Sequence, residues 1–146
     1  MIYTIGFTKT SAESFFDRIR KSEIETLIDI RLNNRSQLAG FAKAPDIEWF
    51  LHELCHVQYI HDDFLAPTEE ILKDYQKKII DWDGYVLRFD ELMNQRNIQQ
   101  YIEKDYSELR DKNVCLLCSE ATPEMCHRRL VAEYFSQTFQ TNIKHL

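Results

Sequence analysis

The 146-residue sequence lacks several features that would assign it to a specialised class of protein. No apolar run approaches the roughly 20 residues that a membrane-spanning helix needs, so we predict no membrane partner. No basic leader precedes the apolar N-terminal segment, so we expect no signal peptide. No internal repeat, low-complexity tract or linker divides the chain, and its length fits one domain over residues 1–146.

An excess of basic residues is also missing. The 24 acidic residues outnumber the 18 lysines and arginines, and the formal net charge is −6. Broad binding to DNA or RNA needs a basic face, so the charge balance does not support a nucleic-acid partner, although a local basic patch stays compatible with one. Cysteine is limited to four residues without a secretory context, which favours reduced thiols and a cytoplasmic location.

Short apolar runs alternate with amphipathic segments along the chain. The runs predict strands over residues 2–5, 26–30, 57–61, 114–118 and 142–146. Helical spacing predicts helices over about residues 10–22, 46–56, 69–80, 85–104 and 123–139. This alternation predicts an α/β fold: a single Rossmann-like domain with a mostly parallel sheet of about five strands and helices on both faces.

Local signals refine this outline. The first 30 residues have the size of a βαβ unit, which predicts that its two strands pair in parallel. Thr10 and Glu13 fit a capping box, and Asp46 fits the N-cap of the next helix. The two consecutive helices between residues 69 and 104 look like an insertion that covers the edge or top of the sheet.

The segment from residue 116 to residue 129 concentrates the reactive side chains. It runs from an apolar strand into an amphipathic helix, with Thr122 placed as N-cap and Pro123 as the first helical residue. Ligands of open α/β sheets bind where strands end, and a helix N-terminus there offers free N–H groups. The sequence therefore predicts a ligand site at this turn.

Residues that suit an anion follow three of the predicted strands. Residues 30–45 form a long loop with no acidic residue, and loops of this length are often functional. Parallel strands would bring together an anion-binding set that comprises Gly6, Thr8, Arg31, Arg35 and Arg128. The alternative is that Arg31 pairs with Asp29 or Glu120 and only holds the strand ends together.

The catalytic candidates are Glu120, His127 and Cys118. Glu120 and His127 are acid/base candidates, and Cys118 is a candidate nucleophile near a helix dipole and arginines. The alternative for Cys118 is a small buried apolar side chain. A phosphatase loop is excluded because no arginine lies at the usual short spacing after Cys118. A third hypothesis is a redox-active pair of Cys118 with Cys126.

A zinc site is a further hypothesis, because Cys115, Cys118, Cys126 and His127 are all zinc-ligand types. Side chains alternate along a strand, so Cys115 and Cys118 should face opposite sides. Cys126 and His127 would be about 100° apart on a helix. We therefore predict no metal site, and the sequence assigns no cofactor.

Three motifs carry a resemblance to a known family. Cys118-x-Glu120 followed by Cys126-His127-Arg128 resembles the signature of the DUF488 family. Tyr3-Thr4-Ile5-Gly6 resembles its opening strand, and the segment from Thr26 to Arg31 resembles its second strand. The resemblance implies an α/β Rossmann-like fold. It implies no reaction, because this family is one of unknown function.

Two functions stay open at this point. One is a protein with an anion- or nucleotide-binding site at the strand ends, acting as an enzyme on a nucleotide or nucleic acid. The other is a non-enzymatic interaction module that binds a protein or DNA partner through the basic loop of residues 31–45.

Overall fold

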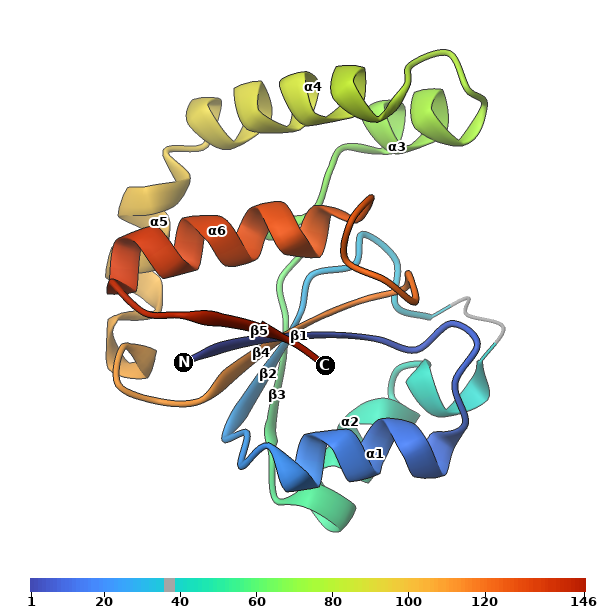
Figure 1. The fold of residues 1–146 in the computed structure, drawn as a ribbon, viewed down its shortest axis with the longest axis vertical. Helices are drawn as coiled ribbons and strands as arrows, with labels where there is room; N and C mark the ends of the chain where they lie inside the picture. Colours follow the sequence, from blue (N-terminus) through green and yellow to red (C-terminus); the bar gives the residue numbers. More distant parts are fainter. Residues whose placement is uncertain (36–38) are drawn as a thin grey trace.

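The computed structural model describes residues 1–35 and 39–146, and it contains one five-stranded sheet whose strands all run parallel (Figure 1). The strand order is β3-β2-β4-β1-β5. The strands are β1 (Ile2–Gly6), β2 (Thr26–Asp29), β3 (Gln58–His61), β4 (Val114–Cys118) and β5 (Ile143–His145). The predicted α/β fold with a parallel sheet of about five strands is confirmed.

Helices cover both faces of the sheet, as predicted. Figure 1 shows α1 and α2 on one side and α3, α4, α5 and α6 on the other, with α4 beyond α6 as an outer layer. The α-helices of the described residues are α1 (Ala12–Lys21), α2 (Asp46–Cys55), α3 (Glu69–Gln76), α4 (Trp82–Gln95), α5 (Ile98–Asp105) and α6 (His127–Phe139). Among the described residues, no helix combines the length and the apolar character that crossing a bilayer requires.

The pairing of β1 with β2 was wrongly predicted, because β4 lies between them. Gly6 of β1 is in register with Cys118, and Asp29 of β2 is in register with Leu117. All five residues of β4 are buried and apolar, which suits a central strand covered on both faces. The ends of β1 and β2 therefore flank Cys118.

Helix boundaries also differ from the predicted ones. Ser11 caps α1 by accepting the Ser14 N–H at 3.1 Å, while the Thr10 hydroxyl accepts a hydrogen bond from Arg18. Asp46 is the first residue of α2, and the N-cap is Pro45. The helix predicted over residues 85–104 is split by Asn97, whose φ of 51° lies in the left-handed region that asparagine tolerates.

The start of α6 has the largest consequence for the site. Cys126 is its N-cap with extended backbone, so the helix begins at His127 and not near Pro123. Residues 119–126 form a loop that ends in a turn, where the Cys126 N–H donates to the Pro123 carbonyl at 3.2 Å. Cys126 and His127 therefore do not follow helical geometry relative to each other.

Strand alternation distributes the core over the two faces. Leu27, Cys115 and Leu117 pack with α1 and α2, whereas Leu116 and Cys118 pack with α4, α5 and α6. Cys115 and Cys118 thus lie on opposite faces of the sheet, as the alternation predicts.

Gly6 and Arg128 fix the loop that follows β4. Arg128 is fully buried, and its guanidinium donates to the carbonyls of Glu120 and Ala121 and to the Thr4 hydroxyl. A Cβ at position 6 would overlap the Glu120 carbonyl and lie 2.9 Å from Arg128 Nη1. The absence of a side chain at Gly6 lets this loop close onto the end of β1.

We expect Gly6→Ala to destabilise the fold by about 1–3 kcal/mol, because the added methyl group must displace the Glu120 backbone. Gly40→Ala is the matched control, since a Cβ there meets nothing within 4 Å. Its effect should be below about 1 kcal/mol and towards stabilisation. Urea unfolding of both variants measures the difference, and equal effects would contradict the close approach at Gly6.

Candidate functional site

A cavity of about 480 Å³ opens at the carboxyl ends of β2 and β4. The strand ends contribute Arg31, Cys118, Ser119 and Glu120, and the start of α6 contributes Cys126 and His127. The opposite wall comes from α3 and the beginning of α4, and includes Tyr75, Trp82 and Tyr85. The predicted ligand site at the turn after β4 thus coincides with a cavity, and the insertion predicted between residues 69 and 104 forms its wall.

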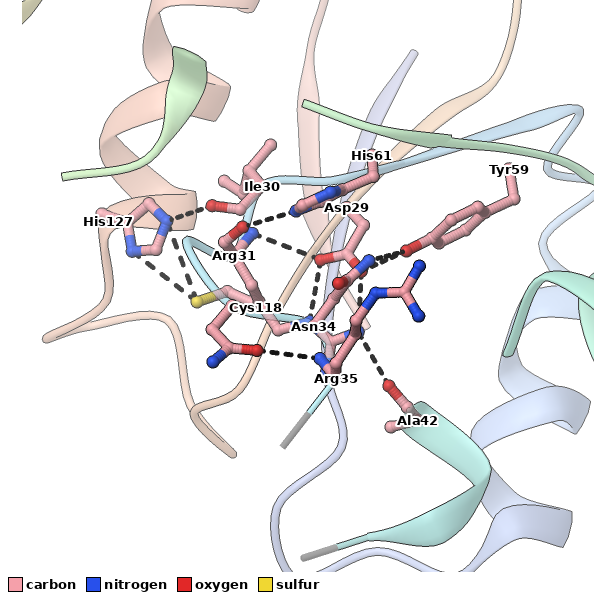
Figure 2. A network of polar contacts seen from close by, with 11 residues as sticks. Asp29, Ile30, Arg31, Asn34, Arg35, Ala42, Tyr59, His61, Cys118 and His127 are labelled. Atoms are coloured by element: carbon pink, nitrogen blue, oxygen red, sulfur yellow. Dashed lines mark hydrogen bonds and ion pairs between the residues drawn. The ribbon is translucent and has the colours of Figure 1, made fainter. Parts of the chain in front are cut away.

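Two thiols and an imidazole meet on the cavity floor. His127 Nε2 lies 2.8 Å from the Ile30 carbonyl, and Nδ1 lies 3.6 Å from Cys118 Sγ (Figure 2). A carbonyl can only accept, so Nε2 carries the hydrogen that it donates. The ligand atoms of Cys118, Cys126 and His127 all lie within 4.8 Å of one another, and all three residues are buried. The floor is therefore a compact sulfur–nitrogen cluster.

The two thiols of the cluster differ in acidity. A hydrogen bond from Cys118 lowers the pKa of Cys126, and the adjacent His127 and Arg128 lower it further. The same bond, together with burial, raises the pKa of Cys118 well above its ordinary value. The sequence identifies Cys118 as the candidate nucleophile, but the structure makes Cys126 the more acidic thiol. All four cysteines are free.

Arg31 forms a buried ion pair with Asp29 at the end of β2. Its Nε and Nη2 donate to the two oxygens of Asp29 at 2.8 and 2.7 Å, and Nη2 also donates to the Ala42 carbonyl at 2.7 Å. The Tyr59 hydroxyl donates to Asp29 at 2.6 Å, and burial followed by the Asp29 charge raises the Tyr59 pKa (Figure 2). The pairing of Arg31 with Asp29 that the sequence left as an alternative is thus present.

The Nη1 atom of Arg31 takes no part in this network. Within the described part of the chain, the buried Nη1 finds no hydrogen-bond acceptor. The guanidinium lies over the ring of Phe7, 5.1 Å from its centroid, and Arg31 itself lines the cavity. A buried N–H donor without an acceptor is costly.

The other predicted anion-binding residues lie elsewhere. Arg35 is exposed, and its guanidinium extends away from Cys118 and His127 in Figure 2. Thr8 is exposed and donates to the Ser119 carbonyl at 2.6 Å, while Gly6 and Arg128 hold the loop after β4. Of the five residues, the described lining of the cavity includes only Arg31.

Of the catalytic candidates, Glu120 is exposed and lines the cavity, so the structure brings Glu120, Cys118 and His127 to one space.

The aromatic wall of the cavity was not predicted from the sequence. Trp82 and Tyr85 are stacked with ring centroids 5.0 Å apart, and Tyr75 lies 5.1 Å from Tyr85. Tyr85 lines the same cavity as the cluster, and burial, followed by the nearby thiols, raises its pKa. The density of aromatic residues between positions 75 and 89 is the signal that could have identified this wall.

We expect Arg31→Met to lower the free energy of unfolding by about 3–5 kcal/mol, because it leaves the buried Asp29 carboxylate uncompensated. Arg35→Ala removes an exposed guanidinium from the same loop and should change stability by less than about 0.5 kcal/mol. Chemical denaturation distinguishes the two. A small effect at both positions would show that the Asp29 pair does not hold the strand ends.

Comparison with known proteins agrees with the motifs at this site. A family model described as "Domain of unknown function DUF488" matches residues 11–135. Searches of the curated proteins and of the solved structures give no match. The matched region includes the strand end at Arg31, the whole cavity lining and most of α6. The chain therefore belongs to the DUF488 family.

Proposed function

We propose that the protein binds a nucleotide or another phosphate-bearing small molecule in this cavity and acts on it as an enzyme. The observation that carries the proposal is the convergence of three features in one space of about 480 Å³. These features are the guanidinium-bearing residue Arg31 in the lining, an aromatic wall and a thiol–imidazole floor. The convergence of polar groups with apolar and aromatic side chains in one pocket is typical of ligand sites.

The ligand class follows from the wall and from Arg31. Trp82 and Tyr75 present ring surfaces on which a base or another flat ring can stack. Arg31 lines this cavity, and a guanidinium is suited to a phosphate or carboxylate oxygen. A ring and an anionic group on one small molecule describe a nucleotide.

The candidates for chemistry lie beside this ligand. Glu120 can exchange protons with solvent because it is exposed. His127 Nδ1 lies 3.6 Å from Cys118 Sγ, close enough for proton exchange with the thiol after small adjustments. The cytoplasmic location that we propose from the cysteine content would keep both thiols reduced.

The alternative function, partner binding through the loop of residues 31–45, has less support. Arg31 is buried in its pair with Asp29, so the exposed basic residues described in this loop are Arg35 and Lys43. Residues 36–38 of that loop lie outside the described residues. We therefore favour the cavity over the loop as the functional site.

The ligand class is tested by thermal shift with phosphate, mono- and dinucleotides and short single-stranded oligonucleotides. We expect one of these ligands to stabilise the protein and Trp82→Ala to weaken its binding by about 5- to 100-fold, the range for losing one stacked ring. Trp49→Ala is the control, because Trp49 is 60% exposed on α2 at the other face of the sheet. No shift with any ligand, or equal losses at both tryptophans, would refute the proposal.

The role of Glu120 is tested with the ligand so identified. Glu120→Gln should abolish most of the turnover while keeping the affinity within a few-fold, since proton transfer typically contributes about 10²- to 10⁴-fold to the rate. Glu124→Gln changes an exposed carboxylate of the same loop that does not belong to the described cavity lining, and it should leave the rate unchanged. Full turnover in Glu120→Gln would remove Glu120 from the chemistry.

A further inference from the structure

The donor atoms on the cavity floor come from two elements. Cys118 is the last residue of β4, Cys126 is the N-cap of α6 and His127 is its first residue. Their ligand atoms lie within 4.8 Å of one another, and each residue lines the cavity. We propose that Cys118, Cys126 and His127 bind one zinc ion, with a fourth coordination position open to the cavity.

The spacing of these donors matches tetrahedral coordination. Zinc bonds of about 2.3 Å to sulfur and about 2.05 Å to nitrogen, at the tetrahedral angle, place sulfur and nitrogen about 3.6 Å apart. The distance from Cys118 Sγ to His127 Nδ1 is 3.6 Å. Sγ also lies 3.9 Å from Nε2, so the separation from Nδ1 suits a bridging ion after a small rotation of the ring or the thiol.

The orientation of His127 selects the coordinating nitrogen. Nε2 donates to the Ile30 carbonyl at 2.8 Å, so its lone pair is unavailable and Nδ1 remains as the ligand atom. A metal-bound histidine usually donates its second N–H to a carbonyl or a carboxylate in this way. The ring is also packed against Phe89, with centroids 5.8 Å apart. The imidazole is thus held in position for an ion before any ion arrives.

Charge favours zinc over a hard cation. The acceptors of the buried Arg128 guanidinium are the Thr4 hydroxyl and the carbonyls of Glu120 and Ala121, all of them neutral. A dication held by neutral donors beside this cation would be repelled. Two thiolates cancel the charge of Zn²⁺, and sulfur with imidazole is a donor set that zinc prefers. A magnesium or calcium site would need several oxygen ligands instead.

From the sequence alone we predicted no zinc site, because the four candidate ligands included Cys115. Cys115 packs on the opposite face of the sheet and cannot reach the cluster. The extended backbone of Cys126, with φ of −136° and ψ of 137°, removes the second objection, because Cys126 and His127 are not separated by a helical step. The result is three protein ligands next to a cavity, the pattern of zinc sites that keep an open position.

The zinc site adds a metal to the proposed function. Only the identity of the molecule at the open coordination position rests on that function. With zinc bound, the thiolates and the imidazole are ligands, and proton exchange falls to Glu120. The open position would take water or an oxygen of the bound ligand. The metal site itself stands on its own three donors.

Zinc titration of the protein, stripped by a chelator under reducing conditions, tests the site. We expect one Zn²⁺ per chain, with Cys126→Ser and His127→Ala each weakening binding by at least about tenfold. Cys115→Ser and Cys55→Ser are the controls, because these cysteines lie away from the cluster, and they should retain zinc. Wild-type affinity in Cys126→Ser, or no zinc bound by the folded wild type, would refute the site.

Cobalt binding to the wild-type protein tests the site even if a cysteine variant fails to fold. Co²⁺ added to the wild-type protein should give the intense visible bands of a tetrahedral site and a thiolate-to-metal charge-transfer band. Their absence from folded protein would refute the proposal. Zinc titrations carried out without nucleotide separate the two proposals. If zinc binds but no nucleotide shifts the melting temperature of the apo or the zinc-loaded protein, only the proposed function is refuted. If a nucleotide shifts the melting temperature but zinc does not bind, only the metal site is refuted.

Discussion

The shape of the site depends on the buried guanidinium of Arg128. It binds the carbonyls of Glu120 and Ala121 from beneath and thereby draws the loop after β4 onto the end of β1. That closure depends on Gly6, where a side chain would occupy the same space. Because the loop is held there, Cys126 reaches the N-cap of α6 with its thiol beside Cys118. Arg128, which does not belong to the described cavity lining, thus positions the thiols of the cluster.

The central position of β4 is the second determinant. Its five apolar residues are buried on both faces, and its neighbours are β1 and β2. Cys118 consequently lies between the end of β1 and the Asp29–Arg31 pair that follows β2. The Ile30 carbonyl, which orients His127, belongs to the same strand end. Placing β4 at an edge would separate the imidazole from the group that fixes its hydrogen.

Regular periodicity made the layers predictable, and single side-chain contacts made the site harder to predict. Alternation in β4 correctly placed Cys115 and Cys118 on opposite faces. The N-cap of α1 is Ser11 and not the predicted Thr10, whose hydroxyl accepts from Arg18, a contact that local patterns do not encode. The charge of Arg128 predicted an anion-binding residue, but in the structure its guanidinium donates to backbone carbonyls. The wall formed by Trp82 and Tyr85 depends on packing between distant segments, which spacing along the chain does not reveal.

The origin of the two sides of the cavity has a consequence for how such a site can diversify. The floor comes from strand ends and the start of α6, whose positions are set by the sheet and by Arg128. The aromatic wall comes from α3 and α4, which the chain adds between β3 and β4. Exchange of α3 and α4 would change the shape of the cavity while the sulfur–nitrogen floor stays intact. Under the proposed function, ligand selection and reactive chemistry would therefore be able to change independently on this scaffold.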